Sequence, residues 1–291
     1  MAFHDTSRSF RCRIINLSIR IVCVVIAYAL WAAGALGQDK VRLEPRAVIE
    51  KRLKSFADDN QARESIIRKW FAESGCAKPN LSEESVKPAL PPNVVCVIPG
   101  ETHEVIVVGA HTDKVPSAGD GVVDNWSGAS LLPSLLFSLG AQKRHHTFVF
   151  VGFTGEERGL IGSEYYADHL SADERAHVEA MVNMDSLGLT PTKVWASHAD
   201  KALLDALASV AAASKLPLST VNVDKLGTTD SESFASYHIP RITLHSVTPE
   251  KMQVLHSADD TLLAINMDDY YDSYRLIAEY LAYLDGVLTP K

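Results

Sequence analysis

The sequence lacks several features that would assign it to a common functional class. It has no basic stripe, and its 28 Lys and Arg residues face 36 Asp and Glu, for a formal net charge of −8. Nucleic acid is therefore not expected as a partner. Ser127 in "DNWSGA" lacks the preceding glycine of a Gly-x-Ser-x-Gly elbow, which argues against a serine hydrolase. No internal repeat, low-complexity tract or break in composition divides the 291 residues into two domains.

One apolar run stands out, and it is slightly shorter than the roughly 20 residues of a membrane-spanning helix. The run "IVCVVIAYALWAAGALG" occupies residues 21–37 and follows several arginines. A basic region, a short apolar stretch and small residues at its end are typical of a secretory signal peptide. We expect residues 1–37 to be a signal peptide and the protein to be exported, to the periplasm or the medium. The alternative is an uncleaved anchor, which would be the protein's contact with a membrane.

Cysteine is scarce, and export changes the meaning of the few that are present. Cys12 and Cys23 would leave with the signal peptide, so Cys76 and Cys96 remain as one pair. In an oxidising compartment such a pair is a disulfide candidate. The alternative is two free cysteines, with Cys96 serving as a small apolar residue in the strand "NVVCVI".

Short β-rich runs alternate with helical stretches along the rest of the chain, residues 38–291. This alternation predicts an α/β fold: a single domain with a mostly parallel mixed sheet and helices on both faces. The expected strands are 93–98, 104–110, 147–153, 179–184, 193–197 and 241–247. The expected helices are 45–57, 61–74, 127–140, 159–169, 200–214, 230–237 and 267–286.

Acidic residues and histidines gather where the expected strands end. "VIVVGAHTD" ends on His111 and Asp113, and the later strands lead to the remaining polar groups: Glu156, Glu157, Asp185 and His256, with Asp124 in a loop before a helix. In such sheets the ligand site lies at the carboxyl ends of the strands. Carboxylates this close together need a compensating cation, and Asp, Glu and neutral His suit zinc.

Five motifs in this order resemble the M28 family of co-catalytic zinc aminopeptidases. They are "HTD", "GVVDNWSGA", "TGEERGLIGS", "NMDSLG" and "HSADDT", and "NVVCVIPG" before them is similar to the family's first strand. The resemblance covers roughly residues 45–287. It implies a fold of the zinc-peptidase, phosphorylase/hydrolase-like type and two Zn²⁺ ions per chain.

The resemblance also implies a role for each matching residue. Asp124 would bridge the two metals, preceding a cis peptide to Asn125. His111 and Asp185 would complete the ligands of one metal, and Glu157 and His256 those of the other. Asp113, two residues after His111 on the same face, would accept the second ring N–H of that histidine. The sequence offers His245 as a rival to His256, but only His256 has the motif around it.

The activity implied is hydrolysis of the N-terminal peptide bond of a peptide with a free N-terminus, by a metal-bound hydroxide. Glu156 would be the general base that moves the proton to the leaving amine. The family's substrate-binding segment matches "TDSESF", which makes Asp230, Ser231 and Phe234 candidate substrate-binding residues; Ser231 replaces a frequent histidine.

Other activities on the same scaffold remain open. A glutaminyl-peptide cyclase has a similar fold with one zinc, and a carboxypeptidase or dipeptidase is also possible. A non-catalytic binding protein would be expected to lose ligands, and none is missing.

Overall fold

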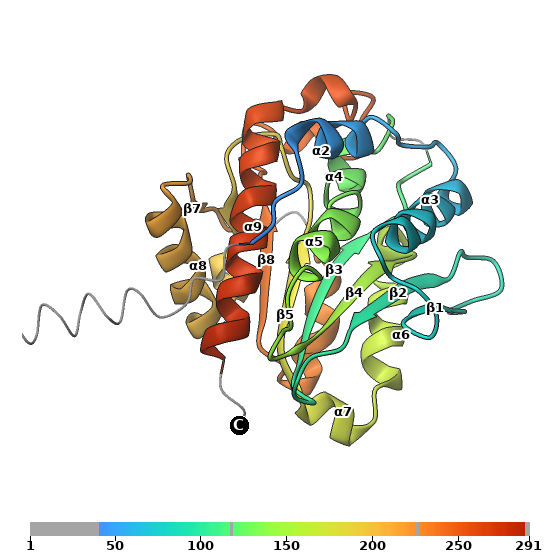
Figure 1. Ribbon diagram of the computed structural model, residues 1–291. Helices are drawn as coiled ribbons and strands as arrows, with labels where there is room; N and C mark the ends of the chain where they lie inside the picture. Colours follow the sequence, from blue (N-terminus) through green and yellow to red (C-terminus); the bar gives the residue numbers. More distant parts are fainter. Residues whose placement is uncertain (1–40, 117–118, 225–226, 289–291) are drawn as a thin grey trace, which may run out of the picture. The chain divides into compact units, whose positions relative to one another are not determined.

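An eight-stranded mixed sheet lies at the centre of the computed structural model (Figure 1). The structure describes residues 41–116, 119–224 and 227–288, so the predicted signal peptide lies outside the described residues. The strand order is β1-β2-β4-β3-β5-β8-β6-β7. The strands are β1 (Leu81–Glu84), β2 (Asn93–Ile98), β3 (Val105–His111), β4 (Thr147–Phe153), β5 (Val178–Met184), β6 (Lys193–Val194), β7 (Ser219–Thr220) and β8 (Arg241–His245).

The middle of the sheet is parallel, and antiparallel pairs lie toward its edges. β4, β3, β5 and β8 pair with one another in parallel, while β1–β2, β2–β4 and β6–β8 are antiparallel. The predicted mostly parallel mixed sheet is thus confirmed. The parallel strands all present their carboxyl ends at one edge, where the polar residues of the sequence follow them.

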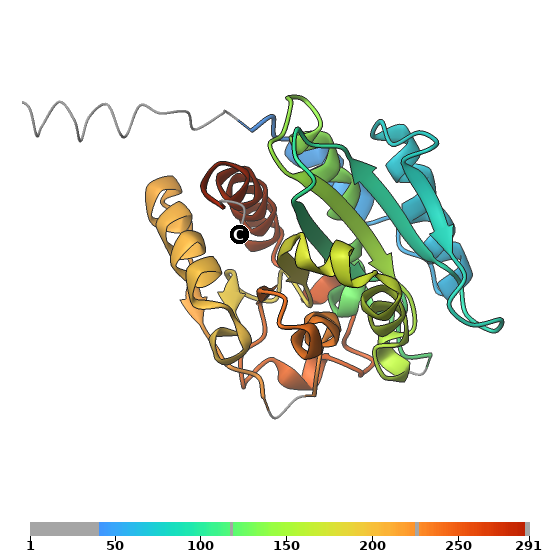
Figure 2. The same ribbon diagram turned by 90° about the horizontal axis from the view of Figure 1, so that it is seen from below.

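Helices cover both faces of the sheet, as predicted. They are α2 (Arg46–Leu53), α3 (Asn60–Glu73), α4 (Ser127–Ala129), α5 (Leu132–Leu139), α6 (Ile161–His169), α7 (Ala172–Ala176), α8 (Lys201–Ser214) and α9 (Met267–Val287). Figure 2 shows α8 and α9 on one side of the sheet and α6 on the other. None of the described helices is long and apolar enough to cross a membrane.

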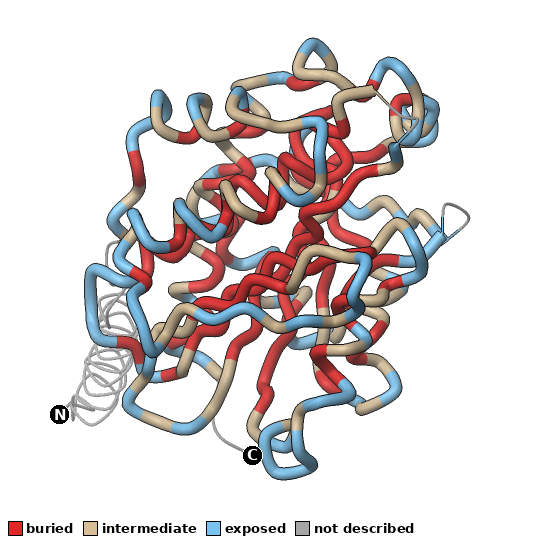
Figure 3. The backbone as a smooth tube through the Cα atoms, turned by 90° about the vertical axis from the view of Figure 1, so that its right-hand side faces the viewer, coloured by how far each residue is buried: buried red, intermediate tan, exposed pale blue. Residues whose placement is uncertain are grey.

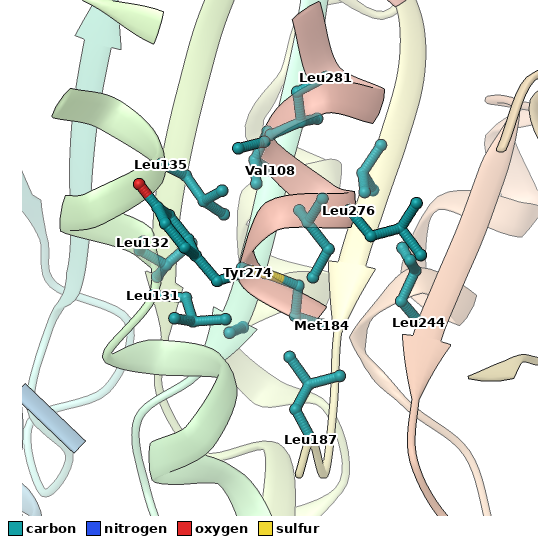
Figure 4. Packing of buried hydrophobic residues seen from close by; sticks show 14 of the residues in the cluster. Val108, Leu131, Leu132, Leu135, Met184, Leu187, Leu244, Tyr274, Leu276 and Leu281 are labelled. Carbon is teal, nitrogen blue, oxygen red and sulfur yellow. The ribbon is translucent and has the colours of Figure 1, made fainter. Parts of the chain in front are cut away.

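Alternate residues of β2, β3, β4 and β5 enter two separate cores. Val108 of β3 joins the larger core, with α2, α3, α5, α8 and α9, whereas its neighbour Val107 joins the smaller core with α6. This follows from the two-residue period of a strand. Figure 4 shows Leu132 and Leu135 of α5 beside Tyr274 of α9 in the larger core. Figure 3 shows that the central strands are buried along most of their length.

Some elements differ from the sequence prediction. The predicted helix 127–140 is broken into α4 and α5, with Pro133 in the first turn of α5, where a missing N–H is tolerated. The segment Asp230–Tyr237 is a 3₁₀ rather than an α-helix. The predicted strand 193–197 contains only the two residues of β6. The elements β1, β7 and α7 were not predicted.

A disulfide joins Cys76, after α3, to Cys96 of β2, with the Cα atoms 6.2 Å apart. The disulfide candidate is therefore confirmed. It ties the N-terminal helical segment to the sheet.

Candidate metal centre and active site

The predicted site residues come together at the carboxyl ends of the central parallel strands. His111 is the last residue of β3, and Asp185 directly follows β5. Glu156 and Glu157 lie in the short 3₁₀ turn Glu156–Arg158 after β4. Asp124 lies in the turn Val122–Trp126 before α4, where its own backbone dihedrals are not helical, and His256 lies beyond β8. Five separate segments thus contribute to one cluster.

Asp124 is shared between two groups of potential metal ligands. Its Oδ1 lies 3.2 Å from His111 Nε2, and its Oδ2 lies 3.1 Å from His256 Nε2. One group contains His111, Asp124 and Asp185; another contains Asp124, Glu157 and His256. These match the two ligand sets that the family resemblance implied, with one carboxylate common to both; a third possible group contains His111, Glu156 and Glu157.

The donor atoms of the cluster fit zinc. Within each group the donor atoms lie within 4.8 Å of one another, and they are imidazole nitrogens and carboxylate oxygens, which zinc accepts. Glu157 Oε2 lies 3.0 Å from His256 Nε2, whereas Glu157 Oε1 is buried and has no hydrogen-bond partner among the described residues. A buried carboxylate oxygen without a partner is costly, and a metal ligand would satisfy it.

The electrostatics of the site indicate an excess of negative charge. Burial, together with Asp230 and Asp185, raises the pKa of Glu156 to about 10, although His111 opposes the shift. Burial disfavours protonation of His111, but Glu156 and the other surrounding carboxylates raise its pKa well above the usual value. Hydrogen bonds with Asp124 and Glu157 raise the pKa of His256 to about 10. In the absence of a metal, protons thus offset the charge that a cation would otherwise balance.

Asp113 orients both His111 and the glutamate turn. The ring Nδ1 of His111 is 3.2 Å from the backbone carbonyl of Asp113 and 3.7 Å from its carboxylate. The carboxylate accepts hydrogen bonds from the backbone N–H groups of Glu156, at 3.1 Å, and Glu157, at 3.4 Å. The carboxylate of Asp113 was expected to accept the second ring N–H of His111, and the backbone carbonyl of Asp113 shares this role. The carboxylate also holds the backbone of Glu156 and Glu157.

The backbone around Asp124 is closely constrained. The Asp124–Asn125 peptide is cis, as the family resemblance implied. Asn125 Nδ2 donates to the carbonyl of Met184, and its Oδ1 accepts from the N–H groups of Gly128 and Ser186. These bonds connect the Asp124 turn to the end of β5, next to Asp185.

Thr229 and Arg63 also support the site, although no sequence motif assigns them a role. Thr229 Oγ1 donates to Asp185 Oδ2 at 2.7 Å and accepts from Asn183 Nδ2, so it fixes the orientation of Asp185. Arg63 of α3 donates to the carbonyl of Gly121 in the Asp124 loop. Thr229 begins the "TDSESF" segment, which was the available signal, whereas nothing in the sequence near Arg63 pointed to the site.

The three candidate substrate-binding side chains are buried and do not lie at the surface of the protein. Asp230 and Phe234 are 0% exposed and Ser231 is 1% exposed. Ser231 Oγ is bonded to Thr243 Oγ1, and Phe234 packs against Phe153 and Tyr166. Both carboxylate oxygens of Asp230 are buried without a partner among the described residues.

His245 is separate from the metal groups. It is buried, and its Nε2 donates to the carbonyl of Val221 at 2.9 Å while its Nδ1 accepts the N–H of Val247. His256, and not His245, belongs to the ligand groups found among the described residues.

Comparison with known proteins places this geometry in a family. The sequence matches the family described as "Peptidase family M28" over residues 93–281. It is 28% identical over 175 residues to aminopeptidase YwaD of Bacillus subtilis, an alignment covering 52% of this chain and 38% of that protein.

Solved structures share the fold. The zinc aminopeptidase BSAP of Bacillus subtilis superimposes with a TM-score of 0.60 at 23% identity, over 66% of this chain and 49% of that one. A glutaminyl cyclase from an Acidobacteriales bacterium superimposes with a TM-score of 0.70 at 17% identity, over 86% of this chain and 98% of that one. The chain thus matches about two fifths of YwaD and about half of BSAP, but nearly the whole cyclase.

Proposed function

Because the chain belongs to peptidase family M28, we propose that it is a zinc-dependent aminopeptidase. In this proposal it binds two Zn²⁺ ions and hydrolyses the N-terminal peptide bond of peptides. The observation that carries the proposal is the position of Asp124, whose two carboxylate oxygens face His111 and His256 at 3.2 and 3.1 Å. A single metal would not require a carboxylate placed between two such groups.

The proposed ligands are His111, Asp124 and Asp185 for one ion and Asp124, Glu157 and His256 for the other. Zinc bound there would polarise the scissile carbonyl and lower the pKa of a water molecule. Glu156 Oε2 lies 4.0 Å from His111 Nε2. The backbone of Glu156 is held in place because its N–H donates a hydrogen bond to the carboxylate of Asp113. With zinc bound and its carboxylate ionised, Glu156 would accept a proton from the attacking water and deliver it to the leaving amine.

The names of relatives support a substrate with a free N-terminus, since aminopeptidase YwaD and the zinc aminopeptidase BSAP match this chain.

A glutaminyl-peptide cyclase is the second candidate. The observation in its favour is the length of the structural match, because the superposition covers 98% of the Acidobacteriales cyclase. The presence of both ligand groups, sharing Asp124, favours the two-metal peptidase.

One experiment separates these activities. Elemental analysis of gently purified protein is combined with a panel of aminoacyl-chromophore substrates, N-blocked controls and N-terminal glutaminyl peptides. The proposal expects two zinc ions per chain, hydrolysis of the free aminoacyl substrates and no reaction with the blocked ones. One tightly held zinc with full activity and cyclisation of the glutaminyl peptides would replace it with the cyclase.

We further propose that the protein is exported, with residues 1–37 removed or retained as a membrane anchor. The disulfide between Cys76 and Cys96 supports this proposal, because disulfides persist in oxidising compartments. Mass determination of the N-terminus of the protein recovered from each cell fraction tests it. A chain beginning near Gln38 in the periplasm or medium is the expected result, and an intact chain in the cytosol would contradict it.

A further inference from the structure

Arg63, in the first turns of α3, is a fully buried cation that the proposed chemistry does not use. Its Nε donates to the carbonyl of Ala57 at 2.7 Å, and its Nη1 donates to the carbonyl of Gly121 at 3.1 Å. Its Nη2 donates to the carbonyls of Gly121 and Asp120. All these acceptors are backbone carbonyl oxygens, so the hydrogen bonds of the planar guanidinium depend on the conformation of the backbone at residues 57 and 120–121.

The backbone that Arg63 contacts is the loop that carries Asp124. Gly121 begins the turn in a left-handed conformation, φ +58°, and a Cβ there would lie 2.6 Å from the Cβ of Lys114. The same Gly121 carbonyl also accepts the backbone N–H of Trp126. The guanidinium carbon lies 5.4 Å from the centre of the Trp126 ring. Arg63 therefore contacts this turn both before and after Asp124.

The charge of Arg63 is not paired by hydrogen bonding to a carboxylate of the described residues. Burial lowers its pKa to about 10, against the electrostatic effect of Asp260 and Asp113, so the guanidinium remains protonated at neutral pH. Burying an ion is expensive, and an apolar side chain of similar volume often stabilises a protein as well or better. Packing alone therefore does not explain an arginine here.

We propose that Arg63 is a positioning residue of the metal centre, which holds the 120–124 backbone so that both oxygens of Asp124 stay directed at His111 and His256. Among the described residues it donates no hydrogen bond to a ligand side chain, and it acts through the carbonyls of Asp120 and Gly121 and its contact with the Trp126 ring. The inference rests on the proposed function, because a metal-binding carboxylate shared by two sites is what requires this fixed backbone.

Three variants test the inference. Arg63→Met removes the charge and all the hydrogen bonds, and Arg63→Lys keeps the charge but loses the planar fork. Arg68→Met is the matched control, since Arg68 lies on the same helix, is 45% exposed and pairs with Glu64 and Glu83. Zinc affinity is measured by competition with a chromophoric chelator, and amide exchange of residues 119–126 is measured in the metal-free proteins.

We expect Arg63→Met to lower zinc affinity by roughly 10- to 100-fold, the usual effect of residues that support metal ligands. Arg63→Lys should lie between this variant and the wild type, and both should exchange amides of 119–126 faster. In zinc-saturated protein, kcat should fall while KM stays within about twofold, because substrate contacts are intact. Arg68→Met should match the wild type in each measurement.

The outcomes separate the inference from the function on which it rests. If folded Arg63→Met and Arg63→Lys proteins show wild-type zinc affinity and wild-type exchange, the positioning role is overturned. If the wild type itself binds no zinc, the proposed function fails. The exchange measurement then still decides whether Arg63 holds the loop.

Discussion

The carboxylate of Asp260 accepts a hydrogen bond from the backbone N–H of Asp124, at 3.2 Å. Its second oxygen accepts from the N–H of Val123, and its backbone carbonyl accepts from Asp120 and Gly121. Asp260 lies four residues after His256. The segment that presents one proposed ligand is thus bonded directly to the loop that presents the shared one.

Asp260→Asn should loosen this connection. An amide has one oxygen, so one of the two N–H groups would face an NH₂ group and lose its acceptor, at a cost of about 1–3 kcal/mol in stability. We also expect zinc affinity to fall roughly 10-fold. Thermal unfolding and chelator competition measure the two effects. Asp259→Asn, at an exposed neighbouring position, is the control; equal behaviour of the two variants would show that the connection is unimportant.

Glu156→Gln should separate proton transfer from metal binding. The variant should retain both zinc ions and lose about 10²- to 10⁴-fold in kcat, the usual contribution of general acid–base catalysis. Glu157→Gln should instead lose zinc. Elemental analysis beside steady-state kinetics distinguishes them. Loss of metal from Glu156→Gln with retention in Glu157→Gln would reverse the two roles.

Gly128→Ala should destabilise the protein through a direct clash. A Cβ at this position would lie 2.6 Å from Asn125 Oδ1 and 2.7 Å from the carbonyl of Met184. Overpacking of this kind costs about 1–3 kcal/mol. Gly286→Ala in α9 is the control, because a Cβ there meets nothing within 4 Å, and alanine favours a helix by up to about 1 kcal/mol. Urea unfolding should move the two midpoints in opposite directions.

His245 should make the folded state sensitive to acid. Burial lowers its pKa from 6.5 to about 4, and its Nδ1 must stay unprotonated to accept the N–H of Val247. Between these values the unfolded state binds more protons, so stability falls as the pH is lowered through this window, by roughly 3 kcal/mol in total. His245→Gln should flatten the dependence of the unfolding free energy on pH between 4 and 7. Exposed His103→Gln should leave the dependence as it is in the wild type.

The sequence predicted those features that depend on local patterns. Apolar runs such as 104–110 identified the central strands, and the residues that follow parallel strands had to meet at one edge. The motif context separated His256 from His245. The capping box of Ser171 and Glu174, which begins the unpredicted α7, is also a local pattern of the sequence.

The remaining features depend on contacts between distant segments. β1 is a short exposed edge strand, "LSEE", with no apolar alternation to identify it. It is a strand because it pairs with β2 in the folded protein, and its composition alone does not indicate one. Arg63 looks like any helix-surface arginine in the sequence, and only folding brings it to the Asp124 loop. Similarly, the motif "TDSESF" contains Asp230 and Phe234 but does not show which distant residues pack around them, so their burial could not be predicted from it.

The spread of the site along the chain has a consequence for when activity can appear. The group of His111, Asp124 and Asp185 comes from the middle of the chain, whereas the group containing Glu157 is incomplete until His256 is in place. Contacts between such distant segments form late, because the chain between them must first be closed into a loop. A nascent or clipped chain ending before residue 256 would therefore have at most half of the centre. Under the proposed function, hydrolysis would therefore require the chain to be folded through His256.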